Sequence, residues 1–497
     1  MAGSRMITVD DATALDGAEI DVAARVAWLL RMARTTAGGQ LRLRALAERL
    51  GTSAARLSRL ETGQLRDGRV VDGYETVLGL PEGSLRAPVD VLCRTFPAAS
   101  PHDADPGSRI DDVRELSRLT GTLQGDGPVT GGQWLRWARA MAAPGNIGMP
   151  EQQCRELLVR LASELARAVS HGYPSRYEAL SLVRCSAYGH LVLDVAKQEL
   201  RRPHAQGLGD LMSAVGEAVT DDALDWCLDL LLDERGYAAQ CGALAIENMG
   251  QIGETDFWAA VAPRLLEALE RTPEGSPQEE WATHLVRLVP PQVWRENGLV
   301  PSRPLPPAAA LPRMGRDASN TVWHRCVAVA QEVGHETGVG EQPMLARLVH
   351  DICFGHWETR AVTAYMLLAG VPAIARAAGP HMAGLVEEAE DPRVRARGAR
   401  RLLGVLHGHD IPPVRRWLTD PDPGLRGSAL AVTGAAGRQV DDEVLRAGLA
   451  DPETSRLALY SAGMSAHPAL AEIAAAEDPD VRNAALWWLE HGGRVAE

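Results

Sequence analysis

The sequence predicts an all-α fold, and three observations support that prediction. Aromatic residues make up only 4 % of the 497 residues, whereas β-strands favour aromatic and β-branched side chains. Alanine, leucine and arginine, which are abundant throughout, are good helix formers. Apolar residues recur at i, i+3 and i+4, as in Leu157-Leu158-Leu161-Leu165, and this is the spacing of an amphipathic helix.

Interruptions of this helical period divide the chain into segments. At 497 residues it has room for two to four domains, because domains usually span roughly 100–200 residues. Stretches rich in Pro, Gly, Ser and Asp predict linkers between them. The boundaries that we predict are a disordered N-terminus (1–19), an N-terminal helical domain (20–96), a linker (97–108), a helical middle domain (109–289), a proline-rich linker (290–319) and a C-terminal repeat domain (320–497).

Within the C-terminal domain a short pattern, D-P-x-(V/L)-R, recurs at Asp391–Arg395, Asp422–Arg426 and Asp478–Arg482. Asp451–Arg456 is a looser copy, and the four prolines, Pro392, Pro423, Pro452 and Pro479, are 31, 29 and 27 residues apart. Asp before Pro is typical of a helix start, with Asp as the cap and Pro at the first helical position. A second helix is predicted in each of the first three units, at Pro413–Leu418, Asp442–Leu449 and Pro468–Ala475.

These repeats resemble short HEAT repeats, and the resemblance implies an α-solenoid built of stacked helix pairs. The alternative is an ordinary helical bundle with coincidental Asp-Pro caps. Weaker copies at Asp233–Gln240 and His356–Arg360 leave open whether residues 109–289 continue the solenoid or form a separate bundle.

A second motif lies between Leu43 and Gly63. A helix with Leu43, Leu46, Ala47 and Leu50 on its apolar side ends at Gly51, which suits a left-handed turn residue. Ser53 can cap a second helix that turns Leu57 and Leu60 inward. With predicted flanking helices at Val22–Arg34 and Val71–Leu80, the segment resembles the helix-turn-helix of the phage-repressor (XRE) family. This resemblance implies a helix-turn-helix domain that binds double-stranded DNA and a transcription regulator.

The charge distribution fits this expectation. Residues 21–70 carry ten arginines and four acidic residues, a net charge of +6, whereas the whole chain carries −14. A basic segment on an acidic body is an electrostatic footprint for phosphate. The acidic remainder confines the expected contact with DNA to this one end.

The resemblance gives each exposed residue of the motif an expected role. The second helix would enter the major groove, with Arg56 and Arg59 long enough to reach guanine edges. Contact with phosphate is expected from Ser53 and Ser58, and apolar contact from Ala54 and Ala55. Glu61 is expected to hold the domain together through an arginine of the first helix. The alternative for both arginines is a solvated basic face that reads no base.

The motif departs from the family at the start of its first helix. The family's usual Ser/Thr-Gln is here Arg42-Leu43, so the phosphate clamp must come from Arg42, Arg44 or Gln40, or be absent. With only alanines at the tip of the second helix, sequence preference could depend on dimer spacing and DNA shape.

No motif of catalysis, cofactor binding or metal binding is present. The chain lacks GxxxxGK(S/T), GxSxG, HExxH and zinc-ligand spacing, and the cluster His350–His356 has no second ligand pair. We expect no enzyme, no cofactor and no metal; an alkyl-base DNA glycosylase, which also uses HEAT-like repeats, would need a basic groove that this acidic body lacks. Seven scattered cysteines, no signal peptide and no long apolar run predict reduced thiols, no membrane and a cytoplasmic, nucleoid-associated protein.

Two pairs of tryptophans stand out. Trp134 and Trp137, spaced i, i+3, predict a packing stripe, with a ligand pocket as the alternative. Trp487 and Trp488 lie on the last repeat helix, which has no second helix after it. Because terminal repeats normally need a polar cap, we expect this edge to be a surface for a second subunit, or to dock on the chain's own middle domain. The alternative is simple internal packing of these side chains.

The sequence therefore predicts a homodimeric, sequence-specific DNA-binding transcription regulator. Its helical body would sense or recruit a protein, a peptide or a small molecule. The alternative is an interaction scaffold that the helix-turn-helix tethers to DNA without strong operator specificity.

Overall fold

The computed structural model describes residues 8–38, 41–96, 113–143, 148–202, 205–301, 304–305, 316–406 and 412–497. Every regular element in these ranges is a helix, and the single extended pairing is an isolated bridge between Ala168 and Val495. The predicted all-α class is confirmed. The predicted linker 97–108 lies outside the described residues.

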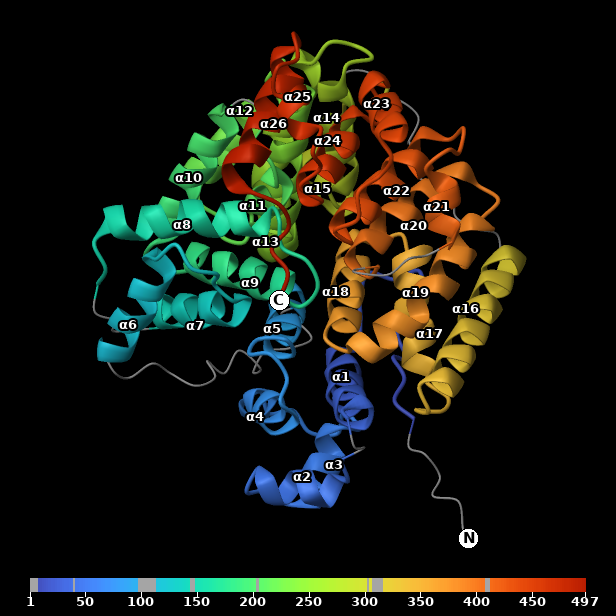
Figure 1. Ribbon diagram of the computed structural model, residues 1–497. Coiled ribbons are helices and arrows are strands. Elements are labelled where there is room, and N and C mark those ends of the chain that lie inside the picture. Colours follow the sequence, from blue (N-terminus) through green and yellow to red (C-terminus); the bar gives the residue numbers. More distant parts are fainter. Residues whose placement is uncertain are drawn as a thin grey trace.

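The N-terminal part is a unit of five helices that ends in a narrow tip formed by its second and third helices (Figure 1). Its helices are α1 (Val22–Thr36), α2 (Leu43–Arg49), α3 (Ala54–Leu60), α4 (Arg69–Leu78) and α5 (Arg86–Thr95).

The middle part forms one flank of the molecule, on the left in Figure 1. Its helices are α6 (Val113–Gln124), α7 (Gly131–Ala142), α8 (Glu151–Leu165), α9 (Gly172–Arg184), α10 (Gly189–Arg201), α11 (Leu208–Val215), α12 (Asp221–Leu230), α13 (Gly236–Arg271), α14 (Pro277–Leu288) and α15 (Pro291–Asn297). Thus part of the stretch predicted as a proline-rich linker, 290–319, is helical, because Pro291 stands at the start of α15, where proline is tolerated.

The C-terminal part begins on the opposite flank, its last helices lie at the top of the molecule in Figure 1, and the end of the chain runs back to the centre. Its elements are α16 (Arg316–Glu336), α17 (Pro343–Cys353), α18 (Glu358–Ala369), α19 (Pro372–Glu387), α20 (Pro392–Arg401), the 3₁₀ helix η2 (Leu402–Gly404), α21 (Pro412–Trp417), α22 (Pro423–Ala435), α23 (Asp442–Ala450), α24 (Ser455–Met464), α25 (Leu470–Ile473) and α26 (Pro479–His491).

The Asp-Pro pattern starts helices as predicted at its three regular copies, whereas after the looser copy at Asp451 helix α24 begins only at Ser455, with Thr454 in the cap position. Asp391, Asp422 and Asp478 cap α20, α22 and α26, and each carboxylate accepts backbone N–H bonds of the first turn. The expected second helices are present as α21, α23 and α25.

The last residue of the pattern, arginine, connects successive units. Arg395, Arg426 and Arg482 each donate to a backbone carbonyl six residues earlier. Arg426 also forms an ion pair with Asp451 of the next unit, and Arg395 lies 3.9 Å from the Asp422 carboxylate. The motif therefore encodes both a helix cap and a link between neighbouring units.

The N-terminal unit shares its core with the C-terminal part. Buried side chains of α1 to α5, such as Trp28 and Leu57, belong to one apolar cluster with side chains of α16 to α22, such as Leu348 and Trp417. The predicted domain 20–96 therefore has no separate hydrophobic core of its own among the described residues. A second cluster fills the middle part and a third lies among α22 to α26.

The first described residues, 8–20, also differ from the predicted disordered N-terminus. Val9, Asp11 and Ile20 are buried. Arg347 and Arg360 donate to the backbone carbonyls of Thr13 and Ala14, over 2.6 Å and 2.8 Å. Hydrogen bonds from arginines far along the chain hold this segment. The prediction of disorder was based on the absence of an apolar helical period in residues 1–19, and that criterion does not detect such bonds.

Candidate nucleic-acid interface

Helices α2 and α3 are joined by a tight turn whose geometry follows from two residues. Gly51 has a φ of +62°, a left-handed conformation that costs glycine little. The side chain of Ser53 then caps α3 by accepting a 3.2 Å hydrogen bond from the Arg56 N–H. Both residues take the positions that the sequence predicted for them.

The inner faces of the two helices fix their mutual position. Leu46, Leu57 and Leu60 are buried against α1 and α4. Glu61, directly after α3, accepts two 2.6 Å bonds from Arg34 of α1 and one of 2.9 Å from the Tyr74 hydroxyl. Burial lowers the pKa of Arg34, but the bonds to Glu61 outweigh this and raise it. The structural role predicted for Glu61 is thus confirmed.

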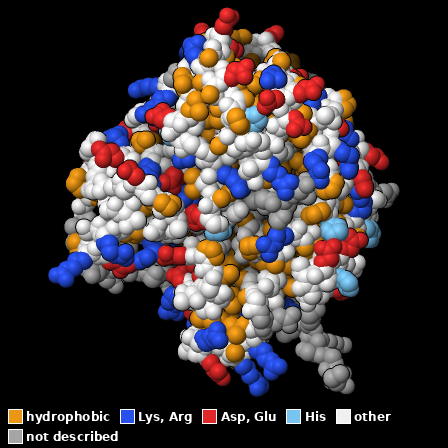
Figure 2. Space-filling model, viewed as in Figure 1, with side chains coloured by type: hydrophobic (Ala, Val, Ile, Leu, Met, Phe, Trp, Pro, Cys, Tyr) orange, Lys and Arg blue, Asp and Glu red, His pale blue; other side chains and the backbone are white. Residues whose placement is uncertain are grey.

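The outer face of α2 and α3 carries the candidate contact residues. Ser53, Ala55, Arg42, Arg44 and Arg59 are exposed, and Ala54, Arg56 and Ser58 are partly exposed. Arg49, which the sequence interpretation did not select, is exposed beside them on α2. Arginine side chains, blue in Figure 2, gather at this end of the molecule. The structure thus brings the predicted residues together on one surface; Gln40 lies outside the described residues.

Arg56 and Arg59 differ in their surroundings. Arg56 forms an ion pair with Asp67, whose carboxylate also accepts a 3.0 Å bond from Arg69. Burial raises the pKa of Asp67, but the bonds from Arg69 and Arg56 outweigh this and hold it below its usual value. Arg59 has no ion pair or side-chain hydrogen bond with another described residue. Asp67 is therefore a functional candidate that sequence reasoning missed, because it lies beyond the motif.

The basic charge counted from the sequence is only partly available at the surface. Arg25 is fully buried between Asp11 and Asp351, at 2.9 Å and 2.6 Å, and Arg34 is bound to Glu61. Neither arginine can approach a phosphate without breaking these pairs. The exposed cations of the tip are those on the outer face of α2 and α3.

Buried ions hold the five-helix unit to the rest of the chain. Asp351 of α17 binds both Arg25 of α1 and Arg360 of α18, the latter at 3.0 Å, and all three side chains are buried. Burial raises the pKa of Asp351, but His350 and Arg25 outweigh this and lower it to about 2. At the other end of the unit, Arg94 of α5 is paired with Glu178 of α9 at 2.6 Å.

The expected surface role of Trp487 and Trp488 is not supported by their positions. Trp488 is 1 % and Trp487 8 % exposed, whereas Leu486 and Leu489 are 47 % and 50 % exposed. A β-carbon on Gly463 would come within 1.9 Å of the Trp488 ring, so α24 and α26 pack closely there. The helical period of α26 turns the tryptophans inward and the leucines outward.

The residues after α26 dock on the chain's own middle part. Val495 donates to the Arg167 carbonyl over 2.8 Å, and the Glu497 carboxylate lies 2.5 Å from Arg176. This contact with the middle domain was one of the two alternatives drawn from the sequence for the end of the chain.

The remaining candidates have structural roles or none. Trp134 and Trp137 are fully buried, with ring centroids 5.8 Å apart, which confirms the packing stripe. No disulfide joins any of the seven cysteines, which all lie in the described part of the chain, and six of them are buried. Within the described ranges, no cluster of three His, Cys, Asp or Glu residues could hold a metal ion. No helix in that part of the chain is long and apolar enough to cross a membrane.

Comparison of the chain with known proteins gave no match: no family model, no curated protein and no solved structure is significantly similar to it.

Proposed function

We propose that this protein is a DNA-binding transcription regulator of the helix-turn-helix type, with an α-solenoid body of HEAT-like repeats that holds a partner. The observation that carries the proposal is the pair of short helices α2 and α3, joined through Gly51 and capped by Ser53, whose outer face displays Arg42, Arg44 and Arg59. In helix-turn-helix proteins the second helix of such a pair enters the major groove.

Within this proposal the arginines of α2 and α3 contact different parts of the DNA. Arg59 is the base-reading residue, because it is exposed on α3 and not committed to a carboxylate. Arg42 and Arg44 contact phosphates, which position the protein but carry no sequence information. Arg56 reaches DNA only by leaving Asp67. We further propose a homodimer, because helix-turn-helix proteins usually bind two-fold operators.

The ion pair between Arg56 and Asp67 also favours a second candidate function. With one of the two long side chains of α3 held by a carboxylate, base reading rests mainly on Arg59. A protein with so little base contact could act as a scaffold that its tip tethers to DNA without strong operator specificity. The two functions differ in the ratio of specific to non-specific affinity.

The experiment that tests the proposal is selection of bound duplexes from a random library, with the wild-type chain and with Arg59→Ala. Arg446→Ala serves as a matched control, because Arg446 is an exposed arginine of α23 outside the tip. We expect a two-fold symmetric motif for the wild type and the control, and loss of one base preference per half-site for Arg59→Ala. Salt-dependent binding without any motif would favour the scaffold, and no recovery of DNA would overturn both functions.

A further inference from the structure

Two adjoining cavities, partly open to solvent, lie between the middle and C-terminal parts of the helical body. The smaller has a volume of about 290 Å³ and lies between α8, α9 and α11 on one side and α18, α20 and α24 on the other. The larger, of about 470 Å³, is lined by α5, α9, α11, α13 and α18. Asp210, Glu358 and Arg400 line both, so the cavities meet at these residues. Together they fall in the range of roughly 300–1,000 Å³ that small ligands occupy.

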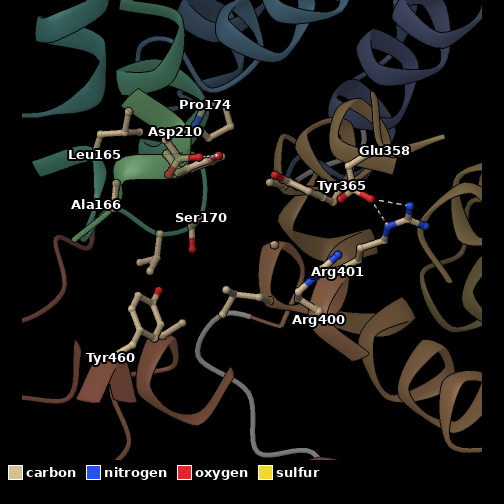
Figure 3. A pocket seen from close by; sticks show the side chains of 18 residues that line it. Leu165, Ala166, Ser170, Pro174, Asp210, Glu358, Tyr365, Arg400, Arg401 and Tyr460 are labelled. Atoms are coloured by element: carbon tan, nitrogen blue, oxygen red, sulfur yellow. Dashed lines mark hydrogen bonds and ion pairs between the residues drawn. The ribbon is translucent and has the colours of Figure 1, made fainter. Parts of the chain in front are cut away.

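The walls combine apolar surface with tyrosines. Figure 3 shows Tyr365 and Tyr460 on different sides of the smaller cavity. Four of the chain's seven tyrosines line the two cavities, namely Tyr173, Tyr177, Tyr365 and Tyr460. In a chain with few aromatic residues, this concentration provides large apolar faces with a polar group at one end, which is the usual character of ligand pockets.

Asp210 on α11 is an acidic group of these walls without a cationic partner. Its carboxylate accepts a 2.8 Å bond from the Tyr173 hydroxyl, and no cation of the described residues lies within ion-pair distance. Burial raises the pKa of Asp210 to about 6, because the carboxylate loses hydration that the single bond from Tyr173 only partly replaces.

Arg400 on α20 is the complementary group on the other side. Figure 3 shows Glu358 joined to Arg401, with Arg400 nearby, across the cavity from Asp210. Glu358 already has a 2.7 Å ion pair with Arg401. The side chain of Arg400 is exposed and forms no ion pair or hydrogen bond with another described residue, so this wall carries one positive charge in excess.

The other charged groups of the walls have partners, some of them outside the walls. Arg94 is bound to Glu178 and Glu217, and Glu247 lies 3.1 Å from His284. Among the residues that line both cavities, Asp210 therefore has no cationic partner and Arg400 no acidic partner, and the two have opposite sign and lie on different walls. A ligand without a positive charge would leave the desolvated Asp210 without a counter-ion, and one without a negative charge would make no use of Arg400.

We propose that the two cavities form one binding site for a small zwitterion, whose ammonium group pairs with Asp210 and whose carboxylate pairs with Arg400. The tyrosine faces and aliphatic walls hold the apolar body between the two charges. Because Val91, Arg94 and Thr95 of α5 form part of the wall, the ligand lies directly against the five-helix unit. This inference rests on the proposal that the helical body binds a partner, and it does not depend on the proposal that the tip binds DNA.

The test uses probes that share one straight chain and differ only in their ends: 6-aminohexanoate, hexylamine and hexanoate, with 8-aminooctanoate to vary the distance between the charges. Their affinities for the full chain are measured by titration calorimetry at pH 7.5. We expect one of the amino acids to bind at least tenfold more tightly than hexylamine and hexanoate.

Two variants assign the charges. Asp210→Asn should weaken binding of the amino acid and of hexylamine about tenfold, and leave hexanoate unchanged. Arg400→Gln should weaken binding of the amino acid and of hexanoate to a similar degree, and leave hexylamine unchanged. Asp194→Asn and Arg446→Gln, at exposed positions outside the cavities, are the matched controls and should bind like the wild type.

Equal affinities for all probes, or loss of the same probes in both variants, would overturn the inference. The result is independent of DNA binding, which is measured on the same preparations. A chain that binds DNA without preferring the zwitterion would refute the ligand site alone. A chain that prefers the zwitterion but binds no DNA would refute the proposed DNA binding alone.

Discussion

Arginines have opposite roles at the tip of the molecule, formed by α2 and α3, and at the junction beneath it, where Asp351 of α17 binds the five-helix unit. On α2 and α3, Arg42, Arg44 and Arg59 extend into solvent. At the junction, Arg25 and Arg360 are buried and share the carboxylate of Asp351. All of them are arginines, so exposure and pairing, not residue type, decide whether the side chain can contact a ligand or stabilises the fold. The predictions that follow separate the two uses.

The largest expected effect is at the junction. Asp351→Asn removes the charge that two buried guanidinium groups share, and breaking a buried ion pair by removing one partner costs about 3–5 kcal/mol. The free energy of unfolding, from urea titrations, is the measurement. Asp225→Asn is the control, because Asp225 pairs with Arg264 at the surface and such pairs contribute at most about 1 kcal/mol. Similar losses in the two variants would contradict the role of Asp351.

The same residue predicts a pH dependence. The pKa of Asp351 is held at about 2 in the folded chain, below the value of about 3.9 expected for an unfolded aspartate. A carboxyl with a depressed pKa stabilises the fold above its unfolded pKa, and this stabilisation is lost as the pH falls from about 5 towards 2. Asp351→Asn should therefore lose less stability than the wild type between these pH values in parallel urea titrations.

At the tip, the largest effect is expected at Arg59. Arg59→Ala should weaken binding to the selected operator by about 1–3 kcal/mol and relax the preference at one base pair. Stability should stay close to that of the wild type, because Arg59 has no ion pair to lose among the described residues. Fluorescence anisotropy with the operator and with one mismatched duplex provides the measurement. An equal loss on both duplexes would assign Arg59 to phosphate.

An intermediate effect is expected in the repeats. Asp422→Ala removes the side-chain cap of α22, which should cost about 1 kcal/mol of unfolding free energy. Asp441 begins α23 without a side-chain cap bond, so Asp441→Ala is the matched control and should cost less. No difference between the two variants would show that the Asp-Pro caps contribute little to the stability of the repeats.

The smallest effect is expected at Asp67, the acidic partner of Arg56 on α3. Asp67→Asn keeps the shape of the side chain but releases Arg56 for contact with phosphate. Binding to duplex DNA should become modestly tighter, and the salt dependence should steepen by about one unit of slope. Unchanged affinity would mean that Arg56 does not reach DNA even when its partner is neutral.

Features carried by local pattern were predictable from the sequence. The all-α class, the caps at Asp391 and Asp422, the turn at Gly51 and the inward Leu57 all follow from residue spacing and backbone preference. The bond of Glu61 to an arginine of the first helix was also expected, and is made by Arg34.

Features that depend on contacts between distant segments were not predictable. Nothing near Arg25 in the sequence shows that Asp351, more than three hundred residues later, binds it. The same holds for the docking of residues 8–20 and for the cavities at Asp210, whose walls come from separate parts of the chain. Counting charge along residues 21–70 overestimated the cationic tip, because Arg25, Arg34 and Arg56 are neutralised by acidic groups in three dimensions.

The central claim is that the solvated arginines of the tip, and not those at the junction, bind DNA. The most direct test is the affinity for one duplex, measured at several salt concentrations, for the wild type and for a chain with Arg42, Arg44, Arg49 and Arg59 all changed to Gln. The account predicts that the variant folds as the wild type does, loses most of its affinity, and shows a salt slope flatter by up to about 3–4 units. Equal affinity and equal slope for the two chains would contradict it.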